Sequence, residues 1–290
     1  MEKGLSTILD GRSLSELIRQ EIKQEIDHHV ASGRRPPALA VVLVGEDPAS
    51  QVYVANKQKA CEKVGIRSLP YFLPSNTTTQ ELLELIAQLN AEEQVDGILV
   101  QLPLPPHINS QEVITAINPS KDVDGFHPEN MGKLVARMEG GFVPCTPLGI
   151  DLLLKHYGVE LKGKDVVVVG EGFIVGRPLS LLLLWRGATV SICHIHTKDI
   201  SQYTKRAEVL ISATGVPGLI KAHMVREGAV VVDIGISRVG DRIMGDVDFE
   251  EVKEKASAIT PVPGGVGPMT VSALLLNTLK AYRKRLGLLG

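Results

Sequence analysis

The chain has 290 residues, of which 44% are hydrophobic and 22% are charged, and its formal net charge is −2. This is an ordinary globular composition, long enough for two domains of roughly 100–200 residues each. Acidic and basic residues are mixed along the chain, which excludes the strongly basic patch of a nucleic-acid binder. The most apolar stretch, residues 179–185, is far shorter than the ~20 residues that cross a bilayer, so we expect no membrane association.

The three cysteines indicate a reducing compartment. Cys61, Cys145 and Cys193 are odd in number and widely spaced, which suits buried thiols better than a disulfide framework or a zinc site. The first 20 residues also lack the apolar core of a signal peptide. We therefore expect a cytoplasmic protein with no metal site.

The first half of the chain alternates helix and strand signals. Ser13-x-x-Glu16 reads as a capping box that opens a helix ending before Pro36-Pro37. Ala38–Val44 is a continuous apolar run, typical of a buried parallel strand. Asp47-Pro48 predicts a helix start, Thr78-x-x-Glu81 another, and Gly97–Val100 a second buried strand. This alternation predicts a parallel sheet.

The second half repeats the pattern after residues 144–147. Asp165–Val169 is a strand of successive valines that ends in a glycine, and a helix follows from about Val175. Three more apolar strands are predicted at residues 188–193, 208–211 and 229–234, and a last helix runs from about Thr270 to Arg285. We therefore predict an α/β protein with two parallel-sheet domains. The first comprises residues 1–145 joined by the helix at about 270–290, and the second comprises 146–269.

A glycine-rich turn joins the valine strand to its helix. Gly170, Gly172 and Gly176 occur in VVVVGEGFIVGRP, spaced G-x-G-x-x-x-G, one residue longer than the usual dinucleotide fingerprint. Small residues at such a turn let backbone N–H groups and a helix N-terminus approach a pyrophosphate. The turn therefore favours a dinucleotide site, with tight packing alone as the alternative.

Four polar residues of the first half suggest a second site. Tyr53 and Lys57 are four apart on one face of the predicted helix. A Tyr-x-x-x-Lys pair is also found in short-chain dehydrogenases, but there the glycine-rich turn comes first, so that assignment is rejected. Gln101 follows a buried strand, at the edge where parallel sheets bind ligands, and Asp124 lies in the turn KDVDG.

Longer motifs make the resemblance specific. From about residue 45 to 270 the chain contains SQVYVANKQKACEKVGI, VQLPLP, NPSKDVDGFHPENMGKL, PCTPLGI and PGGVGPMT. These resemble, in the same order, the signatures of the bifunctional methylenetetrahydrofolate dehydrogenase/methenyltetrahydrofolate cyclohydrolase family (FolD type). The resemblance implies an N-terminal folate-binding catalytic domain and a C-terminal Rossmann-type domain. It implies tetrahydrofolate one-carbon derivatives as substrates and a homodimer.

The resemblance also assigns roles to individual residues. Lys57 matches the family's essential lysine, which serves the proton transfer of methenyl hydrolysis. Gln101 is expected to hold that lysine, and Tyr53 to orient the folate and help position Lys57. Asp124 matches the carboxylate that reads the 2-amino-4-oxo edge of the pterin, where acceptors meet two N–H donors. Oxidation of the methylene group needs no protein base, because orientation against the dinucleotide does most of the work.

A second loop is assigned to the folate cleft in the same way. Pro263, Gly264 and Gly265 belong to PGGVGPMT, and the resemblance implies a tight loop that lines the cleft between the domains. A purely structural turn is the alternative.

The dinucleotide site departs from the family pattern at two positions. The family's turn usually reads G-R-S, and a serine commonly follows the histidine after the next strand, whereas this chain has Glu171-Gly172 and Ile195. A carboxylate at 171 would repel a 2′-phosphate and favours NAD. Four side chains close in the sequence either offer positive charge to a 2′-phosphate or are solvated surface groups: Arg177, His194, His196 and Lys198. The family alone suggests NADP. Backbone contacts from Gly170 to Gly172 and from Ile236 should survive, and NADP is expected with NAD as the alternative.

Three other functions stay open at this point. A cyclohydrolase with a weakened dehydrogenase would explain Glu171 and Ile195. A shikimate-dehydrogenase-like oxidoreductase would explain Lys57 and the glycine-rich turn, but not PGGVGPMT and VQLPLP together. A dinucleotide-binding sensor without turnover would leave Lys57 dispensable.

Overall fold

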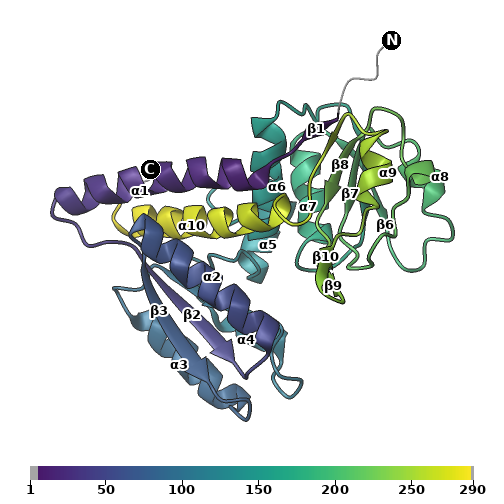
Figure 1. The fold of residues 1–290 in the computed structure, drawn as a ribbon. Helices are drawn as coiled ribbons and strands as arrows, with labels where there is room; N and C mark the ends of the chain where they lie inside the picture. Colours follow the sequence, from purple (N-terminus) through teal and green to yellow (C-terminus); the bar gives the residue numbers. More distant parts are fainter. Residues whose placement is uncertain (1–5, 289–290) are drawn as a thin grey trace. The chain divides into compact units, whose positions relative to one another are not determined.

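The computed structural model describes residues 6–288, which fall into two compact units (Figure 1). Unit 1 is bounded by Met1–Glu16 and Thr146–Thr270, and unit 2 by Leu17–Cys145 and Val271–Gly290. Two long helices, α1 (Gly11–Ala31) and α10 (Val266–Arg285), contribute residues to both units.

Unit 2 contains a three-stranded parallel sheet of order β3-β2-β4. The central strand β2 (Ala38–Val44) and β4 (Gly97–Val100) coincide with the two predicted strands. The edge strand β3 (Arg67–Leu73) was not predicted. The shorter helices of this unit are α2 (Pro48–Val64), α3 (Thr79–Ala91), α4 (Ser110–Ala116) and α5 (Pro128–Val135).

Helices cover both faces of this sheet. Ala40, Val42 and Val44 of β2 share a buried cluster with apolar residues of α3 and α4. Successive side chains of a strand point to opposite faces, so the odd-numbered residues of β2 face the other side of the sheet. Helix α2 packs beside β2 and β3 on that side (Figure 1). Burial on both faces explains why β2 is a continuous apolar run.

The predicted helix starts hold in two cases and fail in one. Asp47 caps α2, with its carboxylate accepting a hydrogen bond from Ser50 N at 2.7 Å. Thr78 and Glu81 form the predicted capping box of α3. The predicted box at Ser13 is wrong, because α1 begins at Gly11. The Asp10 carboxylate accepts hydrogen bonds from the backbone N–H groups of residues 12 and 13. Asp10 therefore caps the helix, three residues before the predicted cap at Ser13.

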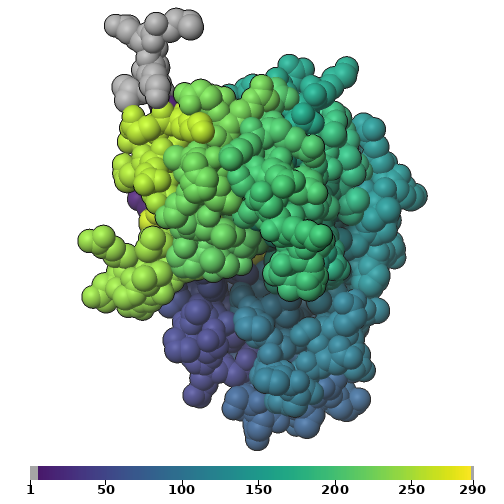
Figure 2. Space-filling model, turned by 90° about the vertical axis from the view of Figure 1, so that its right-hand side faces the viewer, coloured from purple at the N-terminus to yellow at the C-terminus, as the bar shows by residue number. Residues whose placement is uncertain are grey.

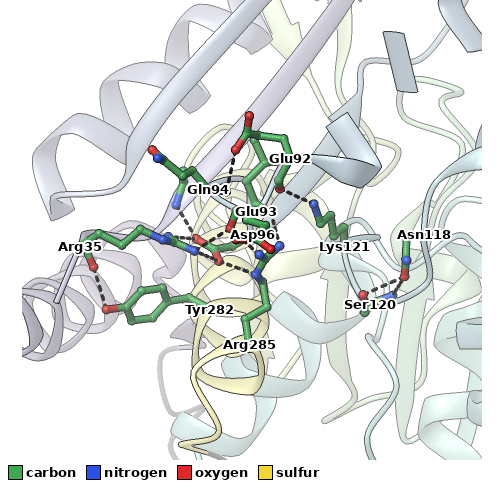
Figure 3. A network of polar contacts seen from close by, with 12 residues as sticks. Arg35, Glu92, Glu93, Gln94, Asp96, Asn118, Ser120, Lys121, Tyr282 and Arg285 are labelled. Carbon is green, nitrogen blue, oxygen red and sulfur yellow. Dashed lines mark hydrogen bonds and ion pairs between the residues drawn. The ribbon is translucent and has the colours of Figure 1, made fainter. Parts of the chain in front are cut away.

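A polar network fixes the end of α10 to the start of the sheet (Figure 3). Asp96 is fully buried immediately before β4 and accepts two hydrogen bonds from Arg35, both at 2.7 Å, and one from Ala38 N at 2.8 Å. From α10, Arg285 approaches the same carboxylate at 3.6 Å, and the Tyr282 hydroxyl donates to Arg35 O at 2.7 Å. The carboxylate is thus paired and hydrogen-bonded, as a buried charge requires.

Lys121 belongs to the same region and has an unusual protonation equilibrium (Figure 3). Its Nζ donates to Leu89 O at 2.9 Å and Glu92 O at 2.7 Å at the end of α3. Burial, with a smaller contribution from the charge of Arg285, lowers the pKa of Lys121 to about 8. The side chain is 4% exposed.

We therefore expect the stability of the protein to rise with pH where Lys121 titrates. Between about 8 and 10.5, the unfolded lysine holds a proton that the folded one has released. Unfolding therefore takes up a proton in this window. Raising the pH across it increases the free energy of unfolding by up to about 3 kcal/mol. Urea unfolding of the parent and Lys121→Met across this range measures the effect. The difference between the two should change with pH; a constant difference would contradict the assignment.

Unit 1 is built on a six-stranded parallel sheet of order β1-β11-β8-β7-β5-β6. Four of its strands match predicted ones: β5 (Asp165–Val169), β6 (Thr189–Cys193), β7 (Val209–Ser212) and β8 (Val230–Asp233). Two short strands were not predicted, β1 (Thr7–Ile8) and β11 (Ala258–Ile259). Because β1 pairs with β11, the residues up to Glu16 group with unit 1 rather than with residues 17–145, which differs from the predicted boundary.

The other elements of unit 1 lie around this sheet. They are α6 (Cys145–His156), α7 (Gly176–Trp185), α8 (Ser201–Thr204), the 3-10 turn η1 (Ala222–Met224) and α9 (Phe249–Lys253). A hairpin of β9 (Ser237–Val239) and β10 (Arg242–Met244) projects from the unit (Figure 2). Within residues 6–288, no helix has the length and apolarity to cross a membrane.

Candidate active site

The first candidate site is built on α2. Its N-cap and Pro48 fix where the helix begins, and Gly65, at φ 85°, ends it in the left-handed conformation that glycine adopts without strain. Tyr53 and Lys57 lie one turn apart within it, so they share a face. Tyr53 is 46% exposed and Lys57 is half-buried. An exposed aromatic ring beside an amine is suited to hold a flat ligand over that amine.

The amine of Lys57 is held by Gln101. Lys57 Nζ donates to Gln101 Oε1 at 2.9 Å. The other side of the amide is fixed as well, because Gln101 Nε2 donates to Leu102 O at 2.7 Å and Gln101 N donates to Val42 O at 2.8 Å. Gln101 therefore presents its oxygen to Lys57 from the carboxyl end of β4, where parallel sheets bind ligands. The contact that the sequence predicted is present.

Asp124 lies in a turn that the neighbouring Asp122 organises. The Asp122 carboxylate accepts hydrogen bonds from the N–H groups of Gly125, Phe126 and His127, the last at 2.8 Å. Gly125 has φ 80°, and a Cβ there would lie 2.7 Å from Pro144 N. The turn is thus pressed against residues 143–145, and only glycine fits at its centre.

Charges connect Asp124 with Lys57. Burial raises the pKa of Asp124, and the Lys57 ammonium and a hydrogen bond from the Cys145 thiol act in the opposite direction. Burial also raises the pKa of the Cys145 thiol well above its usual range, so this cysteine stays a neutral hydrogen-bonding group. Lys57 and Gln101 are therefore in contact within unit 2, and Asp124 lies near enough for the charge of Lys57 to act on its carboxylate.

The glycine-rich turn forms the second candidate site, in unit 1. A Cβ on Gly170 would lie 2.3 Å from Ala213 O, and a Cβ on Gly176 would lie 2.0 Å from Gly170 O. Around Gly172, by contrast, nothing lies within 4 Å of an added Cβ. The first and third glycines are thus required by packing, and the second leaves open space at the start of α7. A pyrophosphate approaching backbone N–H groups fits this arrangement.

The two departures from the family pattern lie on the surface of unit 1. Glu171 is paired with Arg177 at 3.3 Å, and both side chains are about half exposed. Ile195, which follows β6, is 93% exposed. The imidazoles of His194 and His196 flank it, with ring centroids 5.8 Å apart. The carboxylate at 171 is therefore partly neutralised by a neighbouring guanidinium.

The remaining predicted residues border the start of α10. Gly264 has φ 115°, its carbonyl accepts from Arg12 N at 2.9 Å, and Gly265 N donates to Pro261 O at 2.9 Å. The segment containing Pro263 is thus a tight loop, and its contact with folate stays a prediction. Ile236 is 49% exposed and lies 3.7 Å from a Cβ added to Gly267. No three His, Cys, Asp or Glu side chains in residues 6–288 are grouped to hold a metal ion.

Comparisons with known proteins decide the family. The description "Tetrahydrofolate dehydrogenase/cyclohydrolase, catalytic domain" matches residues 9–124, and "Tetrahydrofolate dehydrogenase/cyclohydrolase, NAD(P)-binding domain" matches residues 144–286. "Bifunctional protein FolD" of Aquifex aeolicus is 70% identical over 281 residues, which cover 97% of each chain. The chain belongs to the tetrahydrofolate dehydrogenase/cyclohydrolase family.

Solved structures of this family agree with the fold. The bifunctional enzyme FolD from Campylobacter jejuni is 54% identical, with a TM-score of 0.95 over 97% of this chain and 99% of that one. FolD from Trypanosoma brucei, complexed with NADP and an inhibitor, is 38% identical, with a TM-score of 0.94 over 98% and 99%. Shikimate dehydrogenase from Thermus thermophilus is only 20% identical, with a TM-score of 0.55 over 87% and 94%, and shares the fold alone. The shikimate-dehydrogenase-like alternative is therefore not supported.

Two residues of the catalytic domain were missed by sequence reasoning. Cys145 was interpreted only as a buried thiol, which it is, but it also contacts Asp124. Asn277 of α10 is 3% exposed and donates to Val123 O and Val143 O, on either side of the same turn. A buried asparagine in an otherwise apolar helix segment was the available signal, because a buried amide requires partners.

Proposed function

We propose that the chain oxidises 5,10-methylenetetrahydrofolate to the 5,10-methenyl compound with NADP and hydrolyses that product to 10-formyltetrahydrofolate. Membership of the dehydrogenase/cyclohydrolase family supports both reactions. The observation that carries the proposal is the amine of Lys57, held at 2.9 Å by Gln101 at the carboxyl edge of β4, with Asp124 close enough for its pKa to respond to that amine.

Binding of the substrate is assigned to Asp124 and Tyr53. A carboxylate offers two acceptor oxygens to the two N–H donors of the pterin edge, and charge assistance strengthens such bonds. The exposed ring of Tyr53 lies one helical turn before Lys57 and would orient the folate over the amine. In this assignment Asp124 fixes the register of the pterin, and Tyr53 fixes its distance from Lys57. The loop of Pro263, Gly264 and Gly265 is proposed as a further folate contact.

The oxidation step needs little from the side chains. Gly170, Gly172 and Gly176 would hold the dinucleotide, which would supply the hydride acceptor. The product cation is stabilised by the substrate's own nitrogens, so the chain contributes orientation rather than a base. Backbone groups of Ile236 are proposed to help hold the dinucleotide.

Hydrolysis is the step that requires proton transfer. The oxygen of water bonds to the methenyl carbon and loses one proton, which gives a neutral carbinolamine. The bond from that carbon to N5 then breaks while the hydroxyl loses its proton to become the formyl C=O and N5 takes up a proton, so one proton is released overall. We assign this proton transfer to the half-buried amine of Lys57. Gln101 accepts a hydrogen bond from the amine and so holds it in place.

NADP is proposed over NAD from the surface around Glu171. In NAD-binding turns a carboxylate about 20 residues after the glycines accepts from the ribose 2′-hydroxyl. Here β6 is followed instead by His194, and Lys198 and Arg177 place two cations in this region. Glu171 is engaged by Arg177 at 3.3 Å. This pairing reduces the repulsion of a 2′-phosphate that the sequence alone suggested.

One absorbance experiment tests the two reactions and the cofactor together. Methenyl-tetrahydrofolate absorbs in the near ultraviolet, so its appearance and decay report oxidation and hydrolysis. With 5,10-methylenetetrahydrofolate and matched NADP or NAD, we expect both phases and a kcat/KM at least about tenfold higher with NADP, the equivalent of ~1.4 kcal/mol. A strong preference for NAD would overturn the cofactor assignment. Hydrolysis of added methenyl compound without its formation would identify a cyclohydrolase with a weakened dehydrogenase.

We further propose a cytoplasmic homodimer. All three cysteines are free and buried, which suits a reducing compartment. The β9–β10 hairpin exposes Val239, Ile243 and Met244, each by at least 39%. Exposed apolar side chains gathered on one projecting element are typical of a contact surface. Sedimentation at micromolar concentration should give twice the mass of the chain, and Ile243→Asp should reduce it; a monomeric parent would reject the proposal.

A further inference from the structure

The turn that bears Asp124 is held from outside by a single side chain of α10. Asn277 Nδ2 donates to Val123 O at 2.8 Å and to Val143 O at 3.0 Å, and lies 3.8 Å from the Cys145 sulfur. One amide nitrogen thus spans two segments that are separate in the sequence. Its side chain is 3% exposed, so no water competes for these bonds.

The two segments joined by this amide are those that place the Asp124 carboxylate. Val123 is the residue immediately before Asp124. Cys145 follows Val143 by two residues, and its thiol donates to Val123 O at 3.4 Å. The other side of the turn has no freedom either, because Gly125 packs directly on Pro144. The Asn277 amide, the Cys145 thiol and the packing of Gly125 together fix the Asp124 backbone relative to residues 143–145.

We propose that Asn277 is a positioning residue that aims the Asp124 carboxylate at the pterin edge of the substrate. The inference rests on the proposed function, since it requires Asp124 to bind folate. Two parallel hydrogen bonds to a flat ligand tolerate little displacement of the acceptor. A turn released from Asn277 therefore loses pterin affinity, while the amine of Lys57, held independently by Gln101, keeps its place.

Asn277→Asp is the sharpest test. The side chain keeps its size, but a carboxylate replaces the donor and faces two carbonyl oxygens, so the two bonds become repulsions. We expect the KM for 5,10-methylenetetrahydrofolate to rise at least about tenfold, with the KM for NADP unchanged and kcat within about threefold. Asn277→Ser, which retains one shorter donor, should give an intermediate KM and provides a second variant if the aspartate does not fold.

Thr278→Val is the matched control. Thr278 is the next residue on α10, is fully buried, and donates only within its own helix, to Leu274 O at 2.8 Å. Its replacement removes a buried hydroxyl from the same helix and leaves the donor of the bonds to Val123 O and Val143 O in place. We expect the parental KM for both substrates. A rise equal to that of the Asn277 variants would mean that any disturbance of α10 weakens folate binding, and would overturn the proposal.

A double-mutant cycle separates positioning from general damage. If Asn277 acts through the carboxylate, then Asn277→Asp in an Asp124→Ala background should raise the KM no further, because the group it aims is already absent. Additive effects of the two substitutions would overturn the inference. A parent chain without folate activity would instead overturn the proposed function, so the two failures are distinguishable.

Discussion

Lys57→Ala is expected to lose at least about 100-fold of the rate of methenyl-tetrahydrofolate hydrolysis, the usual contribution of a positioned proton-transfer group. The structure gives the reason. Lys57 Nζ donates to Gln101 Oε1 at 2.9 Å, and within residues 6–288 no other amine hydrogen-bonds to Gln101. No second amine is therefore held there to replace it. Hydrolysis of added methenyl compound, followed by the decay of its absorbance, measures the loss. The melting temperature should change little, because Lys57 is only half-buried.

Lys59→Ala is the matched control for this experiment. Lys59 lies two residues further along α2 and is exposed, so its loss removes the same charge from the same helix. It should leave hydrolysis at the parental rate. Lys57→Met, which keeps the apolar stem, should behave as Lys57→Ala. If either Lys57 variant hydrolysed the methenyl compound as fast as the parent, lysine would have no part in the mechanism.

The fold was predictable where burial is complete. Strands β2, β4 and β5 are continuous apolar runs because helices cover both faces of each sheet, and such runs are easily recognised. Strand β3 was missed because it is an edge strand, with alternating half-exposed residues and Pro70 inside it. Strand β1 has two residues, too few for any periodic pattern. Its pairing with β11 depends on residues about 250 positions away.

The site was predictable only in part, and for a different reason. The spacing of Tyr53 and Lys57 indicates a shared helix face, but their approach to Gln101 and Asp124 followed from the family resemblance rather than from any local pattern. The contacts of Asn277 join residues 132 to 154 positions apart, and no periodic signal reports such contacts. The ion pair of Glu171 with Arg177 shows the same limit, because charge type can be read from a sequence but pairing cannot.

Gly176→Ala is expected to weaken dinucleotide-dependent oxidation strongly. Its added Cβ would lie 2.0 Å from Gly170 O, 2.8 Å from Gly170 C and 2.9 Å from Glu171 Cα, all of them backbone atoms that cannot rotate away. The turn must open, and overpacking of this kind costs about 1–3 kcal/mol of stability. We expect NADP affinity to fall at least about tenfold, since backbone donors of the turn leave their positions. Hydrolysis of added methenyl compound should persist, because Lys57, Gln101 and Asp124 belong to the other unit.

Gly172→Ala separates the two causes that act together at Gly176. Its Cβ would meet nothing within 4 Å, so the melting temperature should match that of the parent. The methyl group would nevertheless enter the open space proposed for the pyrophosphate, so NADP binding should weaken while stability does not. Calorimetric titration and thermal unfolding of both variants measure the two quantities independently. Unchanged NADP affinity in Gly172→Ala would show that the pyrophosphate does not bind at this turn. Parental stability in Gly176→Ala would show that the third glycine is not required by packing, and its conformation at the start of α7 would then need another explanation.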